Sequence, residues 1–108
     1  MTTLEILRGM RELLAEESRW TREYYGRYRD GEGCTNGYDD GACCWCLMGA
    51  AEKVSGERDP GRIERVFIKV LGGRTSGDIF TWNDAPERTH AEILAALDRA
   101  IALESGAS

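Results

Sequence analysis

Two short segments of this 108-residue chain hold most of the residues that could do chemistry. Residues 45–50 read Trp-Cys-Leu-Met-Gly-Ala, and residues 82–89 read Trp-Asn-Asp-Ala-Pro-Glu-Arg-Thr. Together with His90 they supply a thiol, a carboxylate and an imidazole. A thiol near a helix start has a lowered pKa, so Cys46 could act as a nucleophile, with His90 as its base and Asp84 orienting the imidazole. The opposing interpretation is that Cys46 is a small apolar core residue, which is the commoner role of cysteine.

Metal binding is the second chemistry to consider, because the chain has four cysteines and one histidine. The spacing Cys-Cys-x-Cys differs from the Cys-x2-Cys pair of structural zinc sites, and adjacent helical residues point in different directions. Without a secretory signal, the thiols are expected to stay reduced. We therefore predict no metal, no other cofactor and no disulfide for Cys34, Cys43, Cys44, Cys46 and His90.

The polar segment 82–89 also has a structural interpretation. Asn83 and Asp84 can bond to exposed backbone groups of the loop and of the following helix, with the Asp84 carboxylate turned inward. Trp82 would anchor the segment in the core, its indole N–H reaching a carbonyl, and Thr89 would cap the next helix through a Thr-x-x-Glu box. The functional alternative makes Asn83 and Asp84 a ligand-binding or catalytic pair.

Residues 19–29, called the arm below, form the best candidate binding surface. Four aromatic residues alternate with four arginines there, and both types are frequent hot spots of protein interfaces. The same residues could stack on single-stranded bases, but a net charge of −5 argues against a nucleic-acid partner. The predicted binding residues are Trp20, Arg22, Tyr24, Arg27 and Tyr28.

Four helices are expected to position these residues. The first begins at a Thr2-x-x-Glu5 capping box and ends near Ser18. The second covers 42–54, capped by Asp39 or Asp40, and its apolar composition predicts a buried helix. The third begins at Asp59-Pro60 and stops at Gly72-Gly73, and the fourth begins at Thr89.

The segments between the helices are less regular. Spacing of four places Trp20, Tyr24 and Tyr28 on one face of either a strand or a helix, so both forms stay open for 20–41. Aromatic content and the following turn residues favour an extended form. Residues 74–78 read as a loop and 79–82 as a short extended piece. The predicted fold class is mainly α, a small four-helix domain with a β-hairpin or extended arm between helices 1 and 2, in one domain covering 1–108.

Composition excludes several classes of protein. The chain is 42% hydrophobic and 31% charged, with no apolar run long enough for a transmembrane helix. Its acidic balance argues against binding to anionic membranes. The first residues lack a signal peptide, which predicts a cytoplasmic location.

Both motifs resemble those of an uncharacterised family of small bacterial and bacteriophage proteins, catalogued as a domain of unknown function. The similarity rests on Trp-Cys-Leu-x-Gly-Ala at 45–50 and on Trp-Asn-Asp-Ala-Pro-x-Arg-Thr-x-x-Glu at 82–92. It extends to the leading helix, the aromatic arm and the Ala- and Leu-rich last helix, and so covers nearly the whole chain. The pair Cys43-Cys44 departs from the family pattern. The resemblance implies a fold but no activity or cofactor.

Two functions follow as hypotheses. The first is a small cytoplasmic, non-enzymatic interaction protein, an accessory factor of a phage or mobile element that binds a host protein. The alternative is a small cysteine-dependent enzyme or ligand-binding domain that uses Cys46, Asp84 and His90. The oligomeric state is left open.

Overall fold

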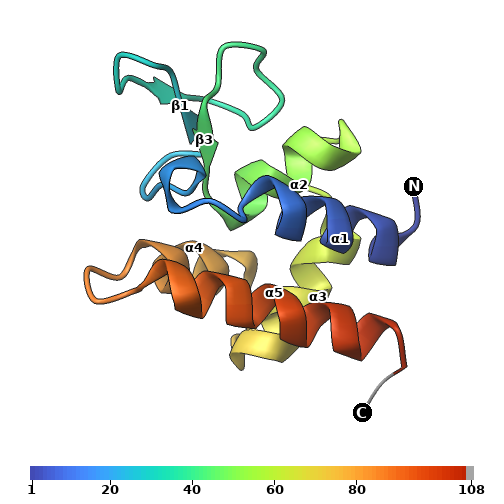
Figure 1. Cartoon of the computed structure of the whole chain (residues 1–108). Helices are drawn as coiled ribbons and strands as arrows, with labels where there is room; N and C mark the ends of the chain where they lie inside the picture. Colours follow the sequence, from blue (N-terminus) through green and yellow to red (C-terminus); the bar gives the residue numbers. More distant parts are fainter. Residues whose placement is uncertain (107–108) are drawn as a thin grey trace.

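The computed structural model describes residues 1–106 and is mainly helical, as predicted. The described part contains five α-helices rather than four, and a small three-stranded sheet lies between the first and second of them (Figure 1). In chain order the elements are α1 (Thr3–Leu13), the 3-10 turn η1 (Glu17–Arg19), β1 (Gly26–Arg27), β2 (Gly33–Cys34), β3 (Cys44–Trp45), α2 (Leu47–Ser55), α3 (Gly61–Leu71), α4 (Ser76–Asp84) and α5 (His90–Glu104).

Helix α1 starts where its capping box predicts. The Thr2 hydroxyl accepts the Glu5 N–H at 3.1 Å, and the Glu5 carboxylate accepts the Thr2 N–H at 2.7 Å. The helix ends at Leu13, well before Ser18, because the apolar pattern stops at Leu14 and the next five residues are all exposed.

Helix α2 is shorter than predicted, because its expected first turns pair with the arm. Cys44 and Trp45 form strand β3, and the Cys43 N–H donates to the Arg27 carbonyl at 2.8 Å. The N-cap is therefore Cys46, whose Sγ accepts the Gly49 N–H at 3.3 Å, and neither Asp39 nor Asp40 caps the helix. Apolar composition marked this segment as buried but did not separate strand from helix.

Helix α4 is the element that the sequence prediction missed. Residues 74–82 were expected to form a loop and an extended piece, yet Ser76–Asp84 is helical. Its start is fixed by Asp78, whose carboxylate accepts the N–H groups of Arg74 at 2.7 Å and Thr75 at 3.1 Å. Burial of Ile79 in the core outweighs the strand preference of a β-branched and aromatic run. Helix α3 begins one residue later than predicted, with Pro60 as its N-cap.

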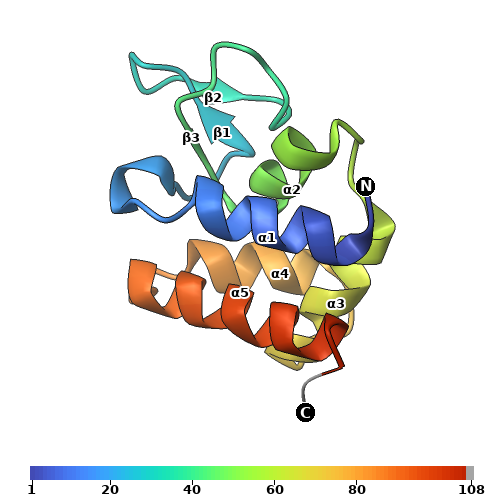
Figure 2. The ribbon, with the colours of Figure 1, turned by 45° about the vertical axis from the view of Figure 1, so that its right-hand side comes forward.

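Residues 20–41 contain no helix; bends and turns surround a short antiparallel hairpin of β1 and β2, which resolves the choice left open above. The strand order is β2-β1-β3, and Gly26 of β1 pairs with both Cys34 and Trp45. Figure 2 shows the sheet above α1, on the same side as α2, while α4 and α5 lie on the opposite side of α1. A separate parallel bridge joins Trp20 to Trp45.

One cluster of buried apolar side chains receives residues from all five helices and from β3. Ile6, Leu47, Phe67 and Leu97 are fully buried within it, and each comes from a different helix. Among residues 1–106, no helix has the length and apolar composition to cross a membrane.

Candidate functional site at the corner between α4 and α5

The amide of Asn83 is the centre of the polar network at this corner. Asn83 is 1% exposed at the end of α4. Its Oδ1 accepts the Trp20 indole N–H at 3.0 Å and the Leu47 N–H at 3.2 Å. Its Nδ2 donates to the Thr21 carbonyl and to the Asp84 carboxylate, at 3.1 and 3.0 Å. All the hydrogen-bonding capacity of the amide is therefore used, and it joins α4, the arm and the first turn of α2.

Asp84 fixes an unusual turn of the arm. Its Oδ1 accepts the Glu23 N–H at 2.8 Å, and Glu23 has a φ of 76°, which side chains other than glycine seldom adopt. The carboxylate is turned into the molecule, but its backbone donor lies in the arm. From the sequence, that donor was expected in the turn after α4 or at the start of α5.

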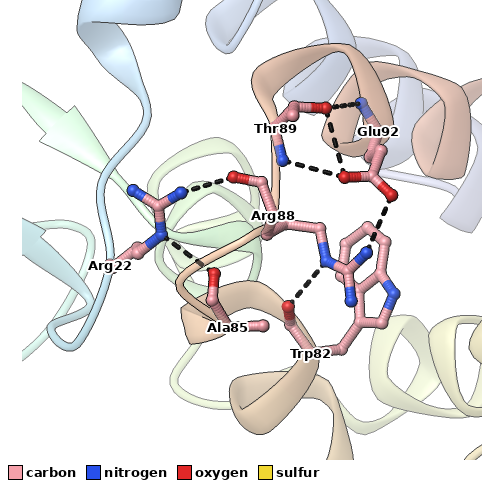
Figure 3. Close-up of polar contacts among 6 residues, drawn as sticks. All are labelled: Arg22, Trp82, Ala85, Arg88, Thr89 and Glu92. Carbon is pink, nitrogen blue, oxygen red and sulfur yellow. Dashed lines mark hydrogen bonds and ion pairs between the residues drawn. The ribbon is translucent and has the colours of Figure 1, made fainter.

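Arg22 ties the arm to the same corner from the other side. Its Nε donates to the Ala85 carbonyl at 3.3 Å, and a terminal nitrogen donates to the Arg88 carbonyl (Figure 3). The guanidinium lies 4.4 Å from the ring centre of Trp20. Two of the five predicted binding residues, Trp20 and Arg22, thus use their polar groups for hydrogen bonds inside the protein.

Arg88 organises the turn between α4 and α5. It donates to the Trp82 carbonyl and to the Glu92 carboxylate, both at 2.9 Å, and stacks 4.0 Å from the Trp82 ring centre. Thr89 and Glu92 form the predicted capping box, with bonds of 3.2 and 2.9 Å (Figure 3). The Thr89 N–H bond lowers the pKa of Glu92. Trp82 is partly buried and packs on the core through its ring.

The three residues of the enzyme hypothesis are each engaged in a different internal contact. Cys46 is 2% exposed, and burial raises its pKa to about 12, so the thiol is protonated at neutral pH. His90 Nε2 lies 2.7 Å from the Leu14 carbonyl, which can only accept, so this nitrogen carries the proton. Asp84 holds Glu23. Among the described residues, no hydrogen bond joins Cys46 to His90.

The remaining cysteines differ in exposure. Cys34 is buried and burial raises its pKa, Cys44 is partly buried and Cys43 is exposed. None of the four is in a disulfide. Within residues 1–106, His, Cys, Asp and Glu side chains form no group of three or more that could hold a metal ion.

The other predicted binding residues divide into engaged and exposed groups. Arg27 donates to the Thr21 hydroxyl and to the Gly31 carbonyl, both at 2.8 Å, and so closes the arm on itself. Tyr28 donates to Asp39 at 2.6 Å. Tyr24 is 46% exposed, and its ring lies 4.7 Å from the Arg27 guanidinium. The Tyr24–Arg27 stack is therefore the part of the predicted surface that faces solvent.

Glu52 is a structural residue that was not among those singled out from the sequence. It is completely buried, and its two carboxylate oxygens accept the N–H groups of Gly37 at 2.7 Å and Asp59 at 2.8 Å. It thereby joins the loop before β3 to the loop before α3. The sequence does hold a signal for this role, because Glu52 directly follows Ala50-Ala51 in a segment predicted to be a buried helix. A carboxylate buried in an apolar helix needs hydrogen-bond partners inside the protein.

Nearly the whole chain matches a family without an assigned activity. The model of a family of unknown function, DUF6197, matches residues 1–103, and the chain belongs to this family. Searches of curated proteins and of solved structures gave no significant match.

Proposed function

We propose that the protein is a small non-enzymatic interaction protein that binds another protein through the exposed side of the arm. The observation that carries this proposal is the Tyr24–Arg27 stack, with Tyr24 46% exposed and Arg27 held beside it by three internal hydrogen bonds. A rigid, exposed aromatic ring beside an arginine loses little conformational entropy on binding.

The three possible catalytic side chains are occupied by burial or by hydrogen bonds within the protein, and this also supports a binding role. A cysteine nucleophile needs an accessible thiolate and a base within hydrogen-bond reach. Cys46 is buried and protonated, and Asp84 and His90 bind the backbone of other segments. A phage or mobile-element origin, a host protein as partner and a cytoplasmic location stay predictions from the sequence.

The test is chemical crosslinking and quantitative mass spectrometry of tagged full-length protein in its source cells. Tyr24→Ala should reduce capture of the main crosslinked partner at least about tenfold, as loss of a hot spot does. Leu103→Ala is the matched control, because Leu103 is 48% exposed at the far end of α5. Equal capture by Tyr24→Ala and wild type, with unchanged melting temperatures, would contradict the proposal.

Iodoacetamide labelling of the native protein separates this proposal from a cysteine-dependent enzyme. Cys43 is exposed and should be labelled first, whereas Cys46 should react only after denaturation, because it is buried with a raised pKa. Rapid labelling of native Cys46 near neutral pH would favour the enzyme instead.

A further inference from the structure

A surface groove lies between α1, α2 and the end of η1, apart from the corner described above. Its volume is about 370 Å³, which is within the range of about 300–1,000 Å³ that small-ligand sites occupy. It is open to solvent and fits one or two side chains rather than a folded domain. The lining residues are Gly9, Glu12, Leu13, Arg19, Lys53 and Val54.

The floor of the groove is apolar because α1 and α2 approach closely at Gly9. A Cβ added there would lie 2.6 Å from Val54 Cγ1, closer than two carbon atoms pack. Val54 and Leu13 are only partly buried, so both present apolar surface to the groove. A side chain placed on them would remove this surface from water.

The rim of the groove is cationic on balance. Arg19 and Lys53 come from two different elements, and both are exposed. Neither takes part in an ion pair with another of residues 1–106. Glu12 is the single carboxylate among the lining residues, which leaves a local charge of +1 (two cations and one anion) in a chain whose net charge is −5.

We infer that this groove docks a short acidic segment of the partner protein. An apolar side chain of that segment lies on Leu13 and Val54, and a neighbouring carboxylate pairs with Arg19 and Lys53. The inference rests on the proposed protein-binding function and adds the chemistry of the partner. Arg19 is also the first residue of the arm, so the groove and the proposed surface share this segment.

Other anionic ligands fit the groove less well. Nucleic-acid binding needs several cations along a backbone track, and this rim has two cations beside one carboxylate. A fatty acid needs an enclosed apolar channel for its chain, whereas this groove is short and open.

The test is an NMR titration of the ¹⁵N-labelled full chain with two hexapeptides, one alternating Leu and Glu and the other alternating Leu and Lys. The acidic peptide should shift the amide signals of Gly9, Leu13 and Val54, and the basic peptide should not. Lys53→Glu should weaken acidic-peptide binding at least about tenfold, as loss of a direct charge pair in an interface does. Lys69→Glu is the control, because Lys69 is exposed on α3 and does not line the groove.

Several outcomes would overturn the inference. These are equal binding of the two peptides, equal weakening by Lys53→Glu and Lys69→Glu, or larger shifts of the same amides by decanoate than by the acidic peptide. The result is separable from the crosslinking test. If Tyr24→Ala abolishes capture but the acidic peptide does not bind, the groove inference alone fails. If the peptide binds but capture is independent of Tyr24, the arm proposal alone fails.

Discussion

The helical body, α1 with α3 and α5, and the sheet region, residues 20–46, are stabilised in different ways. The helical body is stabilised by the burial of apolar side chains such as Ile6, Phe67 and Leu97. The stabilisation is spread over many contacts in one cluster. In the sheet region each strand is two residues long, so the ladder contributes few hydrogen bonds. Single polar side chains from outside the region, above all Asn83 and Asp84, hold it in place.

This difference changes what one substitution can do. An apolar core loses a few contacts when one side chain is shortened, and its neighbours partly relax. A polar network loses several bonds at once, because removing one partner leaves buried donors unsatisfied. Damage in the sheet region should therefore concentrate at a few positions.

The largest effect is expected at Gly49 in α2, where the sheet region packs against this helix. A Cβ there would lie 1.6 Å from the Tyr25 carbonyl oxygen, a backbone atom that cannot move without displacing the arm. Gly49→Ala should cost about 3 kcal/mol or more in the free energy of unfolding, measured by urea denaturation. Gly77→Ala is the control, because its Cβ has normal space in α4, and it should stabilise slightly. Wild-type stability of Gly49→Ala would show that the arm does not pack on α2.

Asn83→Ala should be the next most harmful change. It removes the acceptor of the Trp20 indole and of the Leu47 N–H, and the unsatisfied buried donors should cost about 2–3 kcal/mol in urea denaturation. Asn36→Ala is the matched control, since the Asn36 Oδ1 is buried without a hydrogen-bond partner. Equal losses for the two variants would mean that the network does not stabilise the arm.

Asp84→Ala should cost about 1–2 kcal/mol, because it frees the Glu23 N–H from a cap-type bond. Glu23→Gly should recover part of that loss, since glycine adopts the φ of 76° at Glu23 without strain. A thermodynamic cycle of the two single variants and the double variant measures this coupling. If Asp84→Ala leaves stability unchanged or raises it, the carboxylate serves a ligand rather than the fold.

Alkaline pH tests the sheet region without changing its packing. The hydrogen bond from Tyr28 to Asp39 raises the pKa of Tyr28 to about 12, from an ordinary 10.0. A raised folded-state pKa contributes stability below the unfolded pKa, and that contribution is lost as pH rises from 10.0 to about 12. Tyr28→Phe should therefore lose less stability than wild type across this window. Parallel curves from urea denaturation at several pH values would contradict the assignment.

The smallest effect is expected from chelators and reductants. Melting curves with and without EDTA, and with and without a thiol reductant, should coincide, because the cysteines lack the spacing of a structural zinc site. A large fall in melting temperature with EDTA would mean that a metal ion stabilises the sheet region.

The helical body was predictable because each helix carries its own local signal. Capping boxes at Thr2 and Thr89 fixed two starts, and the spacing of apolar residues marked the buried faces. Helix α4 has a similar box at Thr75, but its β-branched and aromatic residues suggested a strand. Local propensity was outweighed there by packing of Ile79 in the core.

The site was only partly predictable, for a different reason. The sequence singled out Asn83, Asp84 and Arg22 as special, but the bonds that join them across the arm and the α4–α5 corner span 61 to 66 residues. No local pattern encodes such pairs. The same limit explains why Arg22 was taken for a surface residue while its guanidinium binds the α4–α5 turn.

The bond from the Arg22 side chain to the Arg88 carbonyl spans 66 residues and has a consequence for biosynthesis. The arm leaves the ribosome before the residues that hold it, so it cannot reach its native form until residue 88 has emerged. Until then its aromatic rings and nearby thiols are accessible to chaperones and oxidants. We therefore expect closure of this long loop to come late in folding, and the burial of Trp20 against Asn83 should report it through a change in fluorescence.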